Sequence, residues 1–208
     1  MTQDQQWLNQ RRFSLKTLKD FGFGKKSIED SIHFEIDELV EKFFSVSGDL
    51  LIGTDFNVPI INILWQMVAD SRFTPEDKIG MDMLDKVSTI FTSGIKYEAL
   101  PMAFFKIFGE LTGYNKRAKA NSGIFSYLND VIHQHEKDLD ENNPRDFIDV
   151  YLLEIRKQVD DSKYNVKDLI GCIYDFFVAG TETSSTTLKW IVLYLTLHED
   201  VQDRFDFF

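Results

Sequence analysis

The residues best suited to chemistry lie in the middle of a long apolar run near the carboxyl end of the chain. There, Gly180 opens a Thr- and Ser-rich stretch that also contains an acid, Glu182. Asp175, Ala179 and Thr183 recur every four residues, so a helix would place them on one face. The small residues at 179 and 180 predict a shallow groove, and Thr183 could bond back to the Ala179 carbonyl. The pattern therefore predicts a small gap beside a hydroxyl, with a carboxylate one residue away.

The sequence on both sides of this gap predicts a buried helix. Leu169 to Ala179 and Leu188 to Leu195 are apolar almost all the way round. Such a helix is buried on every side or spans a bilayer, and a span needs about 20 uninterrupted apolar residues. Because Asp175, Glu182 and Lys189 interrupt the run, we expect the central helix of a soluble, all-α domain. Weak helix formers at its centre are typical of a functional site, although an ordinary buried helix with a Thr-rich kink remains the alternative.

The first residues of the chain place cations beside apolar side chains. Trp7, Arg11 and Leu15 fall at helical spacing on one face, and a basic face formed by Arg12, Lys16 and Lys19 lies next to it. A buried Arg11 would need an anionic partner. The alternative is that Arg11 extends toward solvent beside a packed Trp7. The basic face is either simply solvated or a docking surface for an acidic partner.

Composition excludes several classes of protein. A length of 208 residues fits one domain, and a net charge of −11 argues against a general nucleic-acid binder. Cys172 is the single cysteine, which excludes an internal disulfide framework. His133 and His135 are two residues apart and would point away from each other on a helix, so no metal site is predicted. The chain begins with polar residues, and we expect no signal peptide.

Helices are predicted along the rest of the chain, at 57–69, from 74 to about 92, at 115–138 and after 143. Ser27, Thr74 and Asn143 are expected to cap helices, the last two with Pro at the next position. The helix after Ser27 is expected to bury one apolar stripe, which consists of Ile32, Ile36, Leu39, Val40 and Phe43.

Three segments resemble the cytochrome P450 monooxygenases, specifically the animal microsomal branch. The residues from Ala179 to Ser184, Ala-Gly-Thr-Glu-Thr-Ser, are similar to the oxygen-activation signature of the family's long central helix. Trp7 to Leu15 is similar to its haem-propionate helix, and Pro144 to Asp149 to a segment typical of that branch. The resemblance covers nearly the whole chain in the right order. It implies that residues 1–208 are one partial, mainly helical domain, with the β-sheets of the full fold mostly absent.

The resemblance also implies roles for individual residues around a haem. Thr183 would hydrogen-bond the iron-bound oxygen, and Glu182 would belong to the proton-supply route. The cofactor-binding residues would be Trp7, Arg11, Ala179 and Gly180. The substrate pocket would be lined by Asp175, Phe176, Ala179 and Thr183. The implied reaction inserts one oxygen atom of dioxygen into a small hydrophobic organic substrate.

The same resemblance implies partners and a location. Electrons would come from NADPH through its cytochrome P450 reductase, which would dock on the basic patch near Arg12, Lys16 and Lys19. The full-length protein would associate with the endoplasmic reticulum membrane, and Phe91 to Phe108 would form a membrane-facing roof over the substrate cavity. A hydrophobic loop lying on the core is the alternative for that segment.

The position of the single cysteine departs from the family pattern, because thiolate ligation of the iron is what favours O–O cleavage. Cys172 precedes Thr183 by eleven residues, about 16 Å along a helix axis, and lies on the oxygen side of the expected haem. We therefore interpret Cys172 as a core residue. We expect the chain to lack the membrane anchor and the haem-cysteine region and to be inactive alone. The alternative function is a non-catalytic, acidic, all-helical interaction protein.

Overall fold

The computed structural model describes residues 5–48, 52–93, 108–110, 112–157 and 163–205, and these ranges contain helices and no β-strand. The elements are α1 (Gln5–Asp20), a 3-10 turn η1 (Lys26–Ile28), α2 (Glu29–Ser45), α3 (Asn57–Ala69), α4 (Lys78–Thr92), α6 (Tyr114–Asp138), α7 (Phe147–Lys157), α8 (Val166–Leu197) and α9 (Glu199–Phe205). The predicted all-α fold is confirmed. Most of the predicted segment from 91 to 108 lies outside the described residues.

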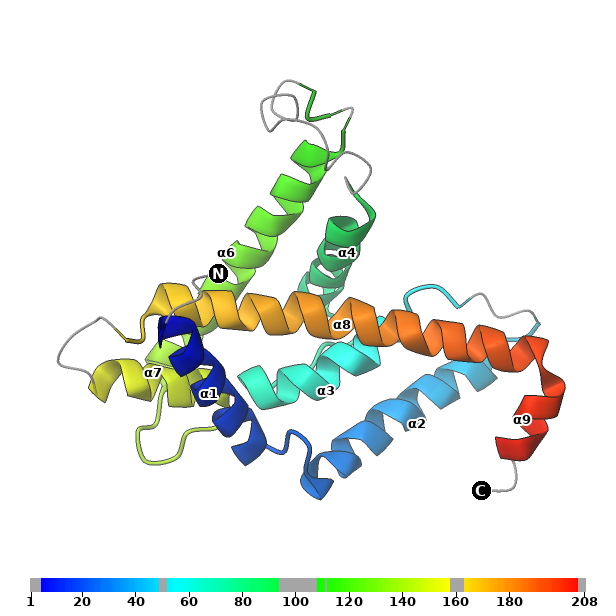
Figure 1. The fold of residues 1–208 in the computed structure, drawn as a ribbon, viewed down its shortest axis with the longest axis horizontal. Helices are drawn as coiled ribbons and strands as arrows, with labels where there is room; N and C mark the ends of the chain where they lie inside the picture. The colour runs from blue at the N-terminus through cyan, green and yellow to red at the C-terminus, as the bar shows by residue number, and fades with distance from the viewer. Residues whose placement is uncertain (1–4, 49–51, 94–107, 111, 158–162, 206–208) are drawn as a thin grey trace.

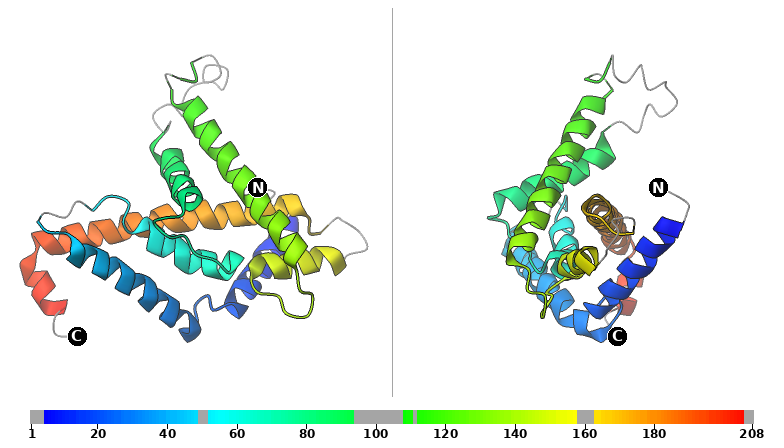
Figure 2. Two further views of the ribbon diagram at one scale, coloured as in Figure 1. Left: turned by 180° about the vertical axis from the view of Figure 1, so that it is seen from behind. Right: turned by 90° about the vertical axis from the view of Figure 1, so that its left-hand side faces the viewer.

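The other helices are arranged around α8, which crosses the whole molecule (Figure 1). Helices α2 and α3 lie on one side of it, and α4 and α6 project together from the other side. Helix α1 crosses the amino-terminal end of α8 near α7, and a view nearly along α8 places α1 and α6 on different sides of it (Figure 2). None of these helices, within the described ranges, has the length and apolar character to cross a membrane.

The core lies between α3, α4, α6, α7 and the first half of α8. Trp65 of α3 packs edge-on against Phe177 of α8, with ring centroids 5.3 Å apart, and stacks on Phe73 at 5.7 Å. The other large, fully buried side chains of α3, α6, α7 and α8 are Ile61, Val68, Ile124, Leu128, Ile132, Phe147, Ile148, Tyr151, Leu169 and Ile173, and α4 adds Val87. Burial of this continuous apolar set is the main force that holds the helices together.

The second half of α8 differs from the prediction of burial on every side. Trp190 is 66% exposed and Leu197 is 71% exposed, and Ile191, Leu193 and Tyr194 are also exposed. The stripe predicted for α2 is likewise wrong in part, because Ile36 and Val40 are exposed. Periodicity shows which side chains could be buried together, but other elements have to cover them.

Three predicted helix starts are wrong by a few residues. Ser27 lies inside the 3-10 turn, and α2 begins at Glu29 without a side-chain cap. Helix α4 begins after Asp77, whose carboxylate accepts hydrogen bonds from the backbone N–H groups of Ile79 and Gly80 at 3.0 Å. Helix α7 begins at Phe147, three residues later than predicted. In both latter cases an Asp carboxylate at the helix start replaces the cap that was expected from a residue before Pro.

The glycines at 80 and 171 provide a matched pair for testing the packing. A Cβ at Gly80 would lie 2.9 Å from Phe73 Cγ and closer still to Cδ1, whereas nothing lies within 4 Å of a Cβ at Gly171. We expect Gly80→Ala to lower the free energy of unfolding by about 1–3 kcal/mol, because the Phe73 ring is fixed in the aromatic core. Gly171→Ala should raise it by up to about 1 kcal/mol through helix propensity.

Urea-unfolding curves of the two variants and the unchanged chain measure both effects. Equal stabilities for the two variants would contradict the packing described here.

Candidate functional site

The predicted face of α8 is present and uncovered. Asn165 caps this helix by accepting a hydrogen bond from the Asp168 N–H at 2.9 Å, and the helix runs unbroken through the Thr-rich stretch. Asp175, Ala179 and Thr183 are all exposed. The Thr183 hydroxyl donates to the Ala179 carbonyl oxygen at 2.7 Å, so the predicted back-bond is confirmed. The helix is not broken by it.

Two of the predicted site residues lie on other sides of α8. Gly180 faces α3, where an added Cβ would lie 2.9 Å from Leu64 Cδ2. It lines a separate apolar groove of about 750 Å³ between α2, α3 and α8. Glu182 is half-buried and accepts a hydrogen bond from Asn57 Nδ2 at 3.2 Å. Since neighbouring helical residues are turned by about 100°, the structure groups Ala179 and Thr183 with Asp175 but not with Gly180.

A cavity joins the amino-terminal helix to this face of α8. It has a volume of about 280 Å³, and its walls include Trp7 and Arg11 of α1 and Asp175 and Phe176 of α8. The Arg11 guanidinium lies over the Trp7 ring, 5.6 Å from its centroid. Of the two alternatives for Arg11, the structure supports the one in which it extends toward solvent beside Trp7, because Arg11 is exposed and Trp7 is 40% exposed. Ala179 and Thr183 continue the α8 face one and two turns beyond this cavity.

Polar contacts that the sequence did not predict hold α1 in place. Gln6 Nε2 donates to Asp168 Oδ2 at 2.6 Å, and Gln10 Nε2 donates to the same oxygen at 3.4 Å. Gln10 Oε1 accepts from the Tyr151 hydroxyl of α7 at 2.8 Å. Glutamines alternate here with Trp7 and Arg11 along α1, so the contacts that anchor the helix leave those two side chains turned toward the cavity. Gln6 and Gln10 are four residues apart and so share one face of α1. That spacing is the sequence signal from which a polar contact at this face could have been predicted.

The charges of the cavity are separated between its two walls. No ion pair involves Arg11 among the described residues, and it supplies a cation on the α1 side. Partial burial raises the pKa of the Asp175 carboxyl on the α8 side. Burial also raises the pKa of the Cys172 thiol to about 11, so at neutral pH this side chain is a thiol and not a thiolate. This supports its interpretation as a packing residue.

These features can bind a particular kind of group. A cation and an indole N–H at one end would hold carboxylates, and a flat apolar body could extend along the α8 face, where the residue at 179 is only an Ala. The Thr183 oxygen would then lie against that body. The arrangement therefore suits a planar, apolar molecule that carries acidic substituents on one edge.

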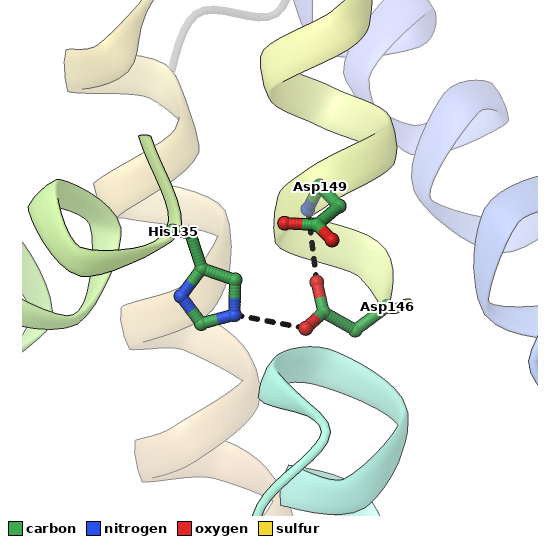
Figure 3. A group of neighbouring side chains, drawn as sticks. All are labelled: His135, Asp146 and Asp149. Carbon is green, nitrogen blue, oxygen red and sulfur yellow. Dashed lines mark hydrogen bonds and ion pairs between the residues drawn. The ribbon is translucent and has the colours of Figure 1, made fainter. Parts of the chain in front are cut away.

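A second cluster of ionisable residues joins the end of α6 to the start of α7. The side-chain ligand atoms of His135, Asp146 and Asp149 all lie within 4.8 Å of one another, and Figure 3 shows them turned toward a common point. His135 Nδ1 lies 2.8 Å from the Val131 carbonyl oxygen, and Nε2 lies 2.8 Å from Asp146 Oδ2. Because a carbonyl oxygen can only accept, Nδ1 carries a proton.

Together with Arg145, these three residues form a structural clasp that links the end of α6 to the start of α7. Asp146 caps α7 by accepting from the Asp149 N–H at 2.9 Å, and Asp149 accepts two side-chain hydrogen bonds from Arg145, at 2.7 and 3.0 Å. A metal ion would have to replace the contact between His135 Nε2 and Asp146 Oδ2 and compete with Arg145 for Asp149. The two carboxylates thus lie against a guanidinium and an imidazole whose protonated form they favour, an arrangement that favours a link between helices over a metal site.

Comparison with known proteins identifies a family match over almost the whole chain. The cytochrome P450 family model matches residues 1–206. Cytochrome P450 2C28 of Mesocricetus auratus is 34% identical over 94% of this chain and 41% of its own length. Cytochrome P450 2J3 of Rattus norvegicus is 35% identical over 96% and 41%, respectively, and cytochrome P450 2C8 of Homo sapiens is 32% identical over 94% and 41%. The chain thus spans about two fifths of the length of these relatives.

The clasp makes stability depend on pH. Burial alone lowers the pKa of His135, but the hydrogen bond and charge of Asp146, together with the Val131 carbonyl, outweigh it, so the pKa lies above the ordinary value of 6.5. The clasp therefore contributes fully below pH 6.5, and its contribution is lost as pH rises through the pKa of the folded protein. We expect His135→Gln to cost about 1–2 kcal/mol below pH 6.5 and progressively less above it.

Denaturant unfolding across this pH range measures the effect, and His133→Gln is the matched control, since His133 is exposed on the same helix. If the loss of unfolding free energy in His135→Gln does not change with pH, Asp146 does not stabilise the protonated form of His135.

Proposed function

Because this chain belongs to the cytochrome P450 family, we propose that it forms the oxygen side of the active site of a haem-dependent monooxygenase. One observation carries the proposal: Trp7 and Arg11 share a cavity with Asp175 and Phe176, at the end of the α8 face that also presents Thr183. These residues come from opposite ends of the sequence. Their convergence is what a single binding site for one molecule requires.

Members of this family bind haem, and the residues on these walls fit it. Arg11 would pair with a haem propionate and the Trp7 indole N–H would donate to one, while Ala179 would leave room for the porphyrin beside α8. Gly180 would act indirectly, by allowing α8 to approach α3 closely. When bound, haem supplies the redox chemistry that activates dioxygen.

Thr183 and Glu182 would handle protons. The Thr183 hydroxyl proton is directed at the Ala179 carbonyl oxygen, and rotation about the Cβ–Oγ1 bond would redirect it to the open face. Glu182, the only carboxylate next to Thr183 in the sequence, would supply protons to that hydroxyl through water. Proton donation by a positioned side chain contributes typically about 10²–10⁴-fold to a rate.

The proposed reaction consumes a C–H bond of a small hydrophobic organic substrate. One atom of dioxygen enters that bond as a hydroxyl, and the other leaves as water. NADPH provides the two electrons through its reductase and becomes NADP⁺, and one further proton is taken up. Asp175, Phe176, Ala179 and Thr183 would line the substrate side of the pocket. The proposed setting is the endoplasmic reticulum membrane, since the matched relatives belong to the animal microsomal branch.

Binding of haem tests the proposal directly. We expect Arg11→Leu to weaken the affinity for haem roughly ten- to hundredfold, because a hydrogen bond to a charged group is worth about 1.5–3 kcal/mol. Haem titration followed by its absorption and by quenching of Trp fluorescence measures the affinity. Arg12→Leu, on the neighbouring face of α1, is the matched control. If both variants bind haem as tightly as the unchanged chain, Arg11 does not hold a propionate.

The exposed basic patch of Arg12, Lys16 and Lys19 is proposed to dock the reductase. Reversing the charge at Lys16 and Lys19 should slow association with the reductase at low ionic strength, with little effect at high salt, because steering between opposite charges is screened by salt. Stopped-flow association rates over a range of salt concentrations measure this. The same reversal at the exposed Lys116 and Lys119 of α6 is the control, and an equal loss there would refute a specific patch.

A further inference from the structure

The first residue of α3 presents an unusual buried amide. Asn57 is 1% exposed, and its Nδ2 donates to Glu182 Oε2 at 3.2 Å. Only Nδ2 can donate to a carboxylate, so the opposite atom, Oδ1, is turned away from Glu182. Among the described residues, Asn57 Oδ1 is the buried side-chain atom that has no hydrogen-bond partner. A buried acceptor left without a donor is costly, and native proteins rarely keep one without a reason.

The neighbouring hydroxyls of α8 do not provide that donor. Thr181 directly precedes Glu182, and Ser185 follows it by three residues. Both side chains are fully buried, and each hydroxyl has a single proton to donate. Thr181 donates to the Phe177 carbonyl oxygen at 2.7 Å, and Ser185 donates to the Thr181 carbonyl oxygen at 2.8 Å. An ordered water molecule, which commonly completes the bonding of buried polar groups, would satisfy Asn57 Oδ1.

The geometry between α3 and α8 explains why this amide reaches Glu182 and no other acid. Gly180 lets Leu64 of α3 approach closely, with an added Cβ only 2.9 Å from Leu64 Cδ2. Glu182 follows two residues later and is turned toward the amino end of α3, where the helix dipole also favours a carboxylate. Thr183, one residue further on, faces the open side.

We propose that Asn57 is a positioning residue for proton delivery: its amide nitrogen fixes the Glu182 carboxylate, and its carbonyl oxygen holds a water molecule beside it. This inference rests on the proposed function, because it gives Glu182 its role. It adds that the proton route begins on the α3 side of α8. Protons would reach Thr183 from behind the helix face that carries it, and the open side would be left to the substrate.

The hydrogen bond itself can be tested without turnover. In protein labelled with ¹⁵N-Asn, the side-chain signal of Asn57 is the one that disappears in Asn57→Leu. We expect the Asn57 signal to shift in Glu182→Gln, because the carboxylate that accepts from Nδ2 is replaced by an amide, and to stay unchanged in Thr181→Val. If the Asn57 signal is unchanged in Glu182→Gln, the hydrogen bond between Asn57 and Glu182 is wrong. A crystal structure in which a protein group donates to Asn57 Oδ1 would overturn the water site.

The role in proton delivery is tested in the full-length, haem-loaded enzyme. Asn57→Leu should lower kcat roughly tenfold and increase the ratio of rates in H₂O and D₂O, with KM and haem affinity unchanged. Thr181→Val should behave as the unchanged enzyme. If Thr183→Ala slows turnover but Asn57→Leu does not, the Asn57 role is wrong. If Thr183→Ala has no effect either, the proposed function of this helix face is wrong.

Discussion

The close packing of α3 against α8 is the constraint on which the rest of the structure depends. Phe177 of α8 packs edge-on against Trp65 of α3, and Gly180 brings the two helices together at Leu64. Because successive helical residues are turned by about 100°, packing Phe177 and Gly180 against α3 fixes the rotation of α8 about its axis. Ala179 and Thr183 must then face away from α3. The exposed site face is thus a consequence of a buried contact on the other side of the same helix.

The second wall of the site depends on hydrogen bonds more than on apolar packing. Gln6 and Gln10 hold α1 to Asp168 and Tyr151, while the aromatic ring of Phe13 packs on α7 at 5.2 Å from the Tyr151 ring. Amide contacts fix the position of α1 along α8 because they need particular partners, whereas apolar contacts tolerate sliding. The cavity between the two helices can therefore be kept open while its walls stay in register.

Much of the fold could be predicted from the sequence, and the misses share a physical cause. The bounds of α3 were predicted correctly and those of α6 to within one residue, because long amphipathic or apolar periods are strong signals. The starts of α4 and α7 were missed, since Thr74 and Asn143 offered good local caps while Asp77 and Asp146 formed the actual ones. Local patterns cannot rank two plausible caps a few residues apart.

In the candidate site too, local helical spacing could be predicted from the sequence and contacts between distant residues could not. The face shared by Asp175, Ala179 and Thr183 was predictable because it depends only on helical spacing. The contact between Asn57 and Glu182 spans 125 positions in the chain, and a polar residue at the start of an apolar helix looks like an ordinary cap. Consecutive residues on a helix necessarily point to different surroundings. Here Glu182 lies toward the α3 side and Thr183 at the open face, so in the proposed route a proton passing between them would go around α8 rather than along one side of it.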